Sequence, residues 1–141
     1  MKKTIQKIQA IILVLTLTLT LASCTAKTPT GLWENATYTQ DTELGNGEKT
    51  VTVEVKAEEK TVTFTIKTDK STVGEALLEH SLIEGEESQY GLYVKKVNGI
   101  TADYDKNGAY WAFYVDNEYA MSGVDTTEIA KNAVYRLEYA K

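Results

Sequence analysis

Two runs of alternating apolar and polar residues begin at residue 50. Val51, Val53 and Val55 alternate with polar residues in the first run, and residues 61–67 repeat the pattern in the second. A period of two is typical of a β-strand with one buried face. Residues 57–60 are short enough to form a hairpin turn, although they lack the Asn-Gly pair common there. The pattern therefore predicts two antiparallel strands.

A short helix is predicted next. Thr72-Val73-Gly74-Glu75 fits a capping box, in which the Thr hydroxyl and the Glu carboxylate accept hydrogen bonds from free backbone N–H groups. Ala76, Leu77 and His80 continue the helical spacing, and Gly85 is suited to end the helix. A helix of roughly three turns is marginal alone, so we expect it to pack against the sheet.

Three further strands are predicted at residues 92–97, 110–115 and 134–139. In the middle one, alternation places Trp111, Phe113 and Val115 on one face, which we expect to be core, and the opposite face carries Tyr110, Ala112 and Tyr114. A hairpin, a helix and further strands make one α+β domain over residues 50–141. This order of elements suits a β-grasp-like mixed β-sheet with one packed helix.

The N-terminus has the layout of a secretory signal peptide. A basic start precedes an apolar run from Ala10 to Ala22, which is shorter than the roughly 20 residues of a membrane-spanning helix. Leu21-Ala22-Ser23-Cys24 resembles the lipobox of bacterial lipoproteins, in which the cysteine is lipidated and becomes the mature N-terminus. The sequence thus predicts a signal peptide over residues 1–23 and lipidation at Cys24. An uncleaved helix, or a free thiol at an ordinary cleavage site, are the alternatives.

The segment 24–49 has no sustained period. It holds the only proline, Pro29, among turn-forming and charged residues, and we expect it to be a flexible tether that lifts the domain off the membrane. Trp33 and Tyr38 do not fit that composition. They either dock onto the domain edge or sit in a loose linker, and the sequence leaves both open.

The charge of the chain argues against nucleic acid as a partner. Residues 1–23 hold Lys2, Lys3 and Lys7 and no acid, so their removal takes the formal net charge from −5 to −8. An acidic domain is repelled by nucleic acid and by anionic lipid. Arg136 is the only arginine, which argues against a bidentate clamp on phosphate or carboxylate.

Residues 50–141 resemble the transcobalamin C-terminal-like domain family. The pieces that carry the resemblance are Thr72-Val73-Gly74-Glu75-Ala76-Leu77, Gly91-Leu92-Tyr93-Val94, Val97-Asn98-Gly99-Ile100, Tyr110-Trp111-Ala112-Phe113-Tyr114-Val115 and Tyr119-Ala120-Met121-Ser122-Gly123-Val124-Asp125. The chain departs from the family in two turns, which read Asp116-Asn117 and Lys131-Asn132. Because Asn tolerates positive φ, both turns can still form. The resemblance implies a β-grasp-like ligand-binding fold, and in transcobalamin-type carriers this domain closes over cobalamin against a helical domain.

The best candidate binding residues lie around the strand 110–115. They are Tyr104, Tyr110, Tyr114, Asn117 and Tyr119. Aromatic rings with a polar tip stack on flat ligands and are enriched at protein interfaces. If the helix leaves their face open, Tyr110 and Tyr114 form a ligand platform. Ordinary cross-strand packing is the alternative.

Other motifs carry less chemistry. Asp103-Tyr104-Asp105-Lys106-Asn107-Gly108 copies the first half of a calcium loop, but Tyr114 stands where the bidentate Glu belongs. A turn between strands is the favoured interpretation. His80 is the only histidine, so neither a metal site nor a nucleophile–base pair can be assembled with a second one. We therefore expect no metal, no cofactor and no enzymatic activity.

These observations favour a lipoprotein anchored at the extracytoplasmic face of the cell membrane through Cys24. Its domain is predicted to bind a small molecule without catalysis, as an accessory to uptake of cobalamin-like compounds. The second hypothesis is a cell-surface protein-interaction or adhesion module, in which the tyrosines meet another surface protein. A pocket would favour the first hypothesis and a flat aromatic patch the second.

Overall fold

The computed structural model describes residues 28–141. The predicted signal peptide (1–23) and lipidation site (Cys24) lie outside the described residues. Within the described part, no helix is both long enough and apolar enough to cross a membrane.

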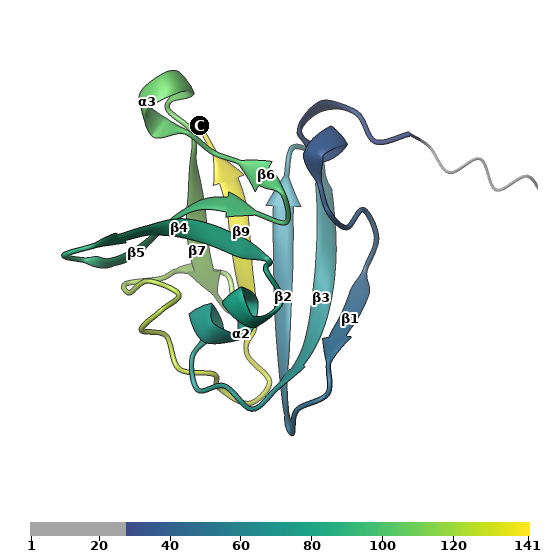
Figure 1. The fold of residues 1–141 in the computed structure, drawn as a ribbon, viewed down its shortest axis with the longest axis vertical. Helices are drawn as coiled ribbons and strands as arrows, with labels where there is room; N and C mark the ends of the chain where they lie inside the picture. Colours follow the sequence, from purple (N-terminus) through teal and green to yellow (C-terminus); the bar gives the residue numbers. More distant parts are fainter. Residues whose placement is uncertain (1–27) are drawn as a thin grey trace, which may run out of the picture.

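A six-stranded mixed sheet forms one layer of the fold (Figure 1). Its strands are β1 (Thr42–Gly45), β2 (Lys49–Ala57), β3 (Lys60–Thr68), β7 (Tyr110–Val115), β8 (Glu118–Tyr119) and β9 (Val134–Ala140). Their order across the sheet is β1-β3-β2-β9-β7-β8. The pairs β1–β3 and β2–β9 are parallel, and the other neighbours are antiparallel. The chain therefore returns to the centre of the sheet with its last strand.

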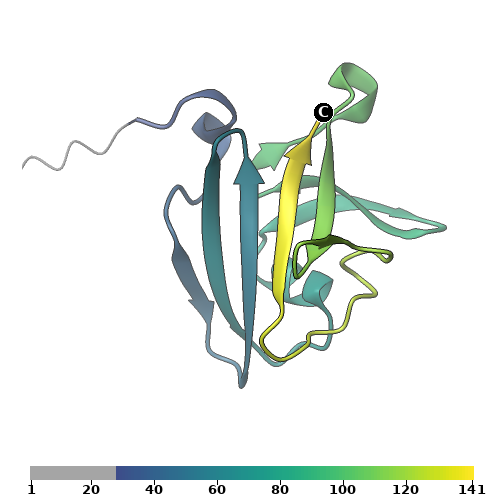
Figure 2. The ribbon, with the colours of Figure 1, turned by 180° about the vertical axis from the view of Figure 1, so that it is seen from behind.

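A second layer covers one face of this sheet. It holds the 3-10 helix η1 (Gly31–Asn35), helix α2 (Val73–Glu79), a small sheet of β4 (Ile83–Ser88), β5 (Gly91–Val97) and β6 (Ile100–Thr101), and the single turn α3 (Tyr104–Asn107). Figure 2 shows the sheet from behind, where none of these elements covers it. The large sheet thus has one buried and one open face, as the alternating sequence predicts.

The core lies between the two layers. Buried side chains come from the inner face of the large sheet and from the elements that cover it, among them Val53, Phe64, Ile66, Leu77, Ile83, Val97, Ile100, Tyr135 and Leu137. Trp111 and Phe113 are 7% and 9% exposed and belong to this core, which confirms their predicted face. Ala112 is also buried, although the alternation placed it on the other face. The α+β class and the five predicted strands are confirmed.

Helix α2 begins where the sequence predicts. The Thr72 hydroxyl accepts a hydrogen bond from the Glu75 backbone N–H at 3.2 Å, and the Glu75 carboxylate accepts one from the Thr72 backbone N–H at 3.1 Å. Backbone N–H groups of Thr72 and Ser71 hold the pKa of Glu75 below its ordinary value. The capping box is therefore complete.

The predicted end of the helix is wrong. The helix ends at Glu79, and Gly85 lies in strand β4 instead. Ser81 has a positive φ of 54°, which stops the helix, and the buried Leu82 and Ile83 lead into the strand. Gly85 follows a register shift in the β4–β5 pair, where an added Cβ would lie 2.2 Å from the Tyr93 carbonyl oxygen. This glycine serves a β-bulge rather than a helix end.

The predicted flexible tether over residues 24–49 is wrong for residues 28–49. Trp33 is 3% exposed, and its indole N–H donates to the Ala57 carbonyl oxygen at 2.9 Å. Strand β1 pairs with β3, and the Tyr38 ring packs edge-on against Phe64 at 5.6 Å between ring centroids. Of the two interpretations left open for Trp33 and Tyr38, docking onto the domain is the one observed. The domain therefore starts about 20 residues earlier than the alternation indicates.

Asn98 fastens this N-terminal segment to the small sheet. Its side chain is fully buried, donates to the Tyr38 carbonyl oxygen at 2.8 Å and accepts from the Tyr38 N–H at 2.9 Å. Its backbone carbonyl accepts from the Thr37 N–H at 2.9 Å. At the neighbouring Gly99, φ is +82° and an added Cβ would lie 2.3 Å from the Asn35 carbonyl oxygen. The Asn98-Gly99 turn thus holds residues 35–38 against the small sheet.

Candidate functional site

Three of the five predicted binding residues gather around Arg136 at one end of the open face. The Tyr114 and Tyr119 rings meet edge to face, with 5.4 Å between their centroids. The Arg136 guanidinium lies 4.6 Å from the centroid of the Tyr114 ring and donates to the Asn117 side-chain oxygen at 2.6 Å. The two turns that differ from the transcobalamin-like family, Asp116-Asn117 and Lys131-Asn132, both form. Asp116, Asn117 and Asn132 all adopt the positive φ that such turns need.

This cluster is internally satisfied. Arg136 also donates to Glu138 at 3.1 Å and lies 3.9 Å from Glu54, and Glu138 pairs with Lys56 at 2.9 Å. These residues follow the strand register, in which Arg136 stands opposite Tyr114 on β7 and Glu54 on β2. Arg136 and Tyr119 both pack against the Tyr114 ring, so Tyr114 serves cross-strand packing. Tyr119 itself remains 61% exposed.

Tyr110 and Tyr104 lie elsewhere. Tyr110 stands at the other end of β7, opposite Ala140, and Tyr104 begins α3, where it is 64% exposed. The five predicted residues therefore do not form one platform. The calcium-like segment folds as the single turn α3, in which Asp103 accepts from the Lys106 backbone N–H at 3.2 Å and Gly108 ends the turn at φ 71°. A hydrogen bond and ion pair from Lys106 hold the pKa of Asp103 below its ordinary value.

The most exposed aromatic residue is at the tip of the β4–β5 hairpin. Tyr90 occupies the two-residue turn between Ser88 and Gly91 and is 89% exposed. The Ser88 hydroxyl shapes the turn, because it donates to the Gly91 carbonyl oxygen at 2.7 Å and accepts from the Tyr90 N–H. Tyr93, on the next strand, is 42% exposed, and both tyrosines line a cavity of about 330 Å³.

The loop after β8 presents a second apolar side chain. Met121 is fully exposed and lines, with Tyr119, a cavity of about 320 Å³. The loop is ordered because it caps α2: the Val73 N–H donates to the Thr127 carbonyl oxygen at 2.9 Å, and the Gly74 N–H to that of Val124 at 2.7 Å. An added Cβ on Gly74 would lie 2.8 Å from the Asp125 Cα, so only glycine permits this approach.

Asp125 joins the hairpin tip to this loop. An added Cβ on Gly91 would lie 2.6 Å from one Asp125 carboxylate oxygen, and one on Gly123 would lie 2.5 Å from the other. Figure 1 shows the loop below the β4–β5 hairpin. We call residues 88–93 and 116–128 together the tip–loop surface. Its exposed large side chains are Tyr90, Tyr93, Tyr119 and Met121.

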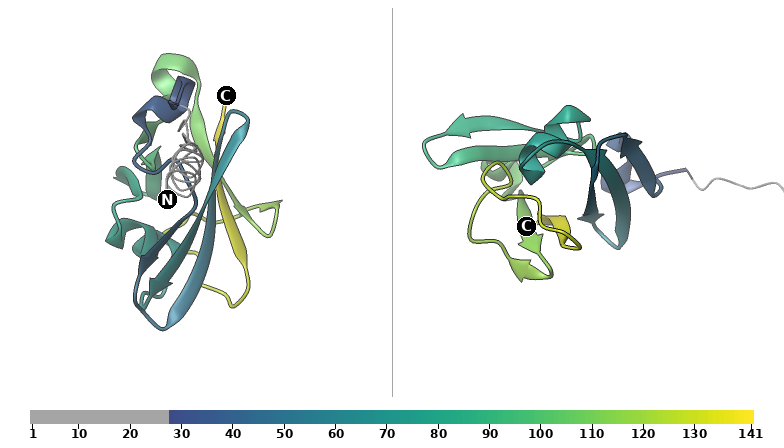
Figure 3. Two further views of the ribbon diagram at one scale, coloured as in Figure 1. Left: turned by 90° about the vertical axis from the view of Figure 1, so that its right-hand side faces the viewer. Right: turned by 90° about the horizontal axis from the view of Figure 1, so that it is seen from below.

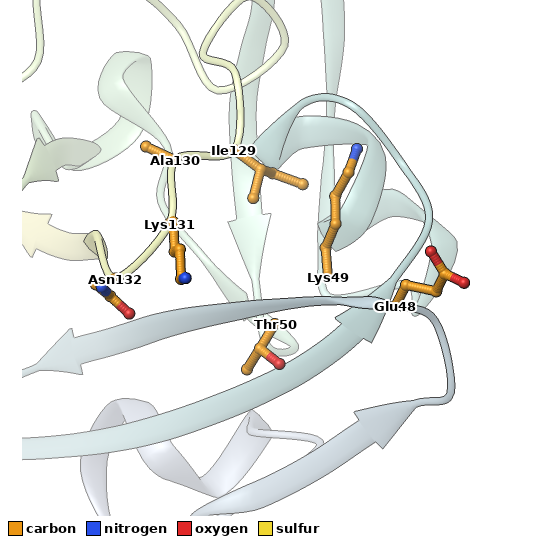
Figure 4. A pocket seen from close by; sticks show the side chains of 7 residues that line it. All are labelled: Glu48, Lys49, Thr50, Ile129, Ala130, Lys131 and Asn132. Carbon is orange, nitrogen blue, oxygen red and sulfur yellow. The ribbon is translucent and has the colours of Figure 1, made fainter.

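A separate cavity of about 470 Å³ lies at the base of the large sheet (Figure 4). It is lined by Glu48, Lys49, Thr50, Ile129, Ala130, Lys131 and Asn132. Its lining contains no aromatic residue and none of the predicted site residues. Its lining mixes two lysines and one glutamate with apolar groups, and it offers no ring on which a flat ligand could stack.

The sequence interpretation missed Tyr90, Tyr93 and Met121. A signal for the first was present, because Ser88-Gln89-Tyr90-Gly91 contains turn-forming residues and a side chain at a hairpin tip cannot be buried by its own sheet. Met121 stands beside Ser122 and Gly123, a loop composition in which a large apolar side chain is unexpected. Residues 28–141 bring no three His, Cys, Asp or Glu side chains into a metal-binding group.

The fold is that of a small two-layer α+β domain with exposed aromatic side chains at one end. The chain belongs to the family described as "Domain of unknown function (DUF4430)", whose profile matches residues 70–141. No curated protein matches the chain.

Two solved structures resemble it. A protein from Ruminococcus gnavus, described as metal-binding, is 28% identical with a TM-score of 0.63, and the match covers 67% of this chain and 98% of that one. Haptocorrin in complex with Cbi is 15% identical with a TM-score of 0.53, and the match covers 69% of this chain. The chain spans only 26% of haptocorrin, and at that identity the likeness shows a shared fold. The resemblance to transcobalamin-type domains is thus supported at the level of the fold.

Proposed function

We propose that this chain is a lipoprotein anchored at the extracytoplasmic face of the membrane, whose domain binds a small ligand through the tip–loop surface. The observation that carries this proposal is the exposure of Tyr90 and Met121, at 89% and 100%, on loops that the fold holds in place. Exposed large side chains that gather on one surface, as Tyr90, Tyr93, Tyr119 and Met121 do here, are typical of binding sites.

A corrinoid is the first candidate ligand. The fold is shared with haptocorrin, whose solved structure contains Cbi, and the sequence resembles transcobalamin-type domains. Tyrosine rings can stack on a flat macrocycle, and their hydroxyls can form hydrogen bonds with its amide groups. Binding, not catalysis, is the proposed role, since His80 packs against Gly45 of β1 rather than on the tip–loop surface.

A protein partner is the second candidate. Two cavities of about 320 and 330 Å³ lie at the small end of the range for ligand pockets, and Tyr and Met are enriched at protein interfaces. This alternative assigns the same surface to a larger partner.

The two candidates separate in a thermal-shift titration of a soluble form that begins at residue 25. A corrinoid at about 100 times its Kd should stabilise the domain by about 2.7 kcal/mol, a rise in Tm of about 10 °C, whereas haem and sugars should give none. Tyr90→Ala and Met121→Ala should each reduce the shift without lowering the Tm of the free protein.

Tyr104→Ala is the matched control, because Tyr104 is equally a solvent-exposed tyrosine but lies on α3, outside the tip–loop surface. It should leave the corrinoid shift unchanged. Equal effects of Tyr104→Ala and Tyr90→Ala would contradict the proposed site, and absence of any corrinoid shift would favour the protein partner.

A further inference from the structure

We propose that lipid on Cys24 holds the domain close to the bilayer by the side that carries η1 and β1, and so turns the tip–loop surface away from the membrane. This inference rests on the lipidation proposed above and adds an orientation to it.

The described chain is fixed to the domain from its start. The Leu32 N–H donates to the Glu58 carboxylate at 3.2 Å, and the buried Trp33 follows directly. Thr28, Pro29 and Thr30 already line one hollow with Glu58, Glu59 and Lys60 of the β2–β3 turn. The N-terminal segment is therefore part of the folded body from its first described residues.

The link between Cys24 and the folded domain is short. Only residues 25–27 separate Cys24 from Thr28, so even a fully extended chain spans at most about 14 Å. Strand β2 has 9 residues and is itself roughly 27 Å long. A link shorter than the domain it carries restricts which side can approach the bilayer.

The side that carries η1 and β1 lies opposite the tip–loop surface. Figure 1 shows β1 and the start of the described chain on one side of the domain and the β4–β5 tip on the other, and the view from below in Figure 3 agrees.

The test uses the full chain, produced with its signal sequence, purified from bacterial membranes and reconstituted in vesicles that contain a headgroup quencher. Fluorophores are attached at Glu59→Cys on the β2–β3 turn or at Gln89→Cys on the hairpin tip. Both sites are exposed, and neither side chain forms a hydrogen bond or ion pair with another residue of 28–141. Quenching should be several-fold stronger at position 59 than at position 89.

A matched chain with 20 Gly/Ser residues inserted between Lys27 and Thr28 is the control. Its link has an average span of about 27 Å, which frees the domain to turn, so the difference between the two labels should largely disappear. Equal quenching in the original chain, or stronger quenching at position 89, would overturn the orientation. Mass spectrometry separates this failure from that of the anchor: a protein without acyl groups on Cys24 overturns both.

Discussion

Replacing Trp33 by Ala is expected to lower the free energy of unfolding by about 3–5 kcal/mol, a large part of the stability of a domain this size. Trp33 is 3% exposed, its indole N–H donates to the Ala57 carbonyl oxygen, and the Lys60 ammonium lies 4.8 Å from the ring centroid. The substitution removes this packing and leaves a cavity at the edge of the core. Urea unfolding of the soluble form measures the loss.

Trp33→Phe retains most of the apolar volume but not the N–H donor, so it should cost less than Trp33→Ala. Tyr104→Ala, at an exposed aromatic position, should change the free energy of unfolding by less than about 0.5 kcal/mol. If Trp33→Ala were as mild as Tyr104→Ala, residues 28–49 would be a tether after all.

The second large effect is expected at Asn98. Asn98→Ala should reduce the free energy of unfolding by about 3 kcal/mol, because it leaves the Tyr38 N–H and carbonyl without their buried partners. Alanine also tolerates the positive φ of 49° less well than asparagine. The same urea titration measures this change, and faster proteolysis within residues 28–45 should accompany it.

Two control variants separate the effect of the lost amide side chain from the effect of the positive φ. Asn98→Gly keeps the freedom to adopt positive φ, so its remaining cost reports the two lost hydrogen bonds. Asn132→Ala makes the same exchange at φ 65° on an exposed residue whose side chain forms no hydrogen bond within the described part of the chain, and should cost about 1 kcal/mol or less. Equal costs at positions 98 and 132 would show that Asn98 does not hold the N-terminal segment.

Strands β2 and β3 could be predicted from the sequence because apolar and polar residues alternate along most of their length. The start of α2 was equally readable, since the capping box is a local signal. Its end was not, because Gly85 suits a helix end and a β-bulge equally well. Only the pairing of β4 with β5 decides between them.

The N-terminal segment could not be predicted for a related reason. Strand β1 has 4 residues, and its pairing with β3 is parallel and joins distant parts of the chain. The burial of Trp33 depends on Ala57 and Lys60, and that of Tyr38 on Asn98 and Phe64. Such contacts leave no period in the local sequence, so polar composition alone indicated a linker.

The candidate site was predictable only in part. Tyr114, Asn117 and Tyr119 do lie together, because β7, its turn and β8 are consecutive. The sequence could not show that Arg136 fills the space beside Tyr114, nor that the β4–β5 tip reaches the loop at Asp125. Both depend on which strands become neighbours.

The central claim is that the tip–loop surface binds a ligand of corrinoid type, and equilibrium dialysis of cobinamide tests it most directly. We expect saturable binding to the soluble form, weakened at least 10-fold when Tyr90 and Met121 are both changed to Ala and unchanged by Tyr104→Ala. A dissociation constant that is the same for the double variant and the unmodified protein would contradict it.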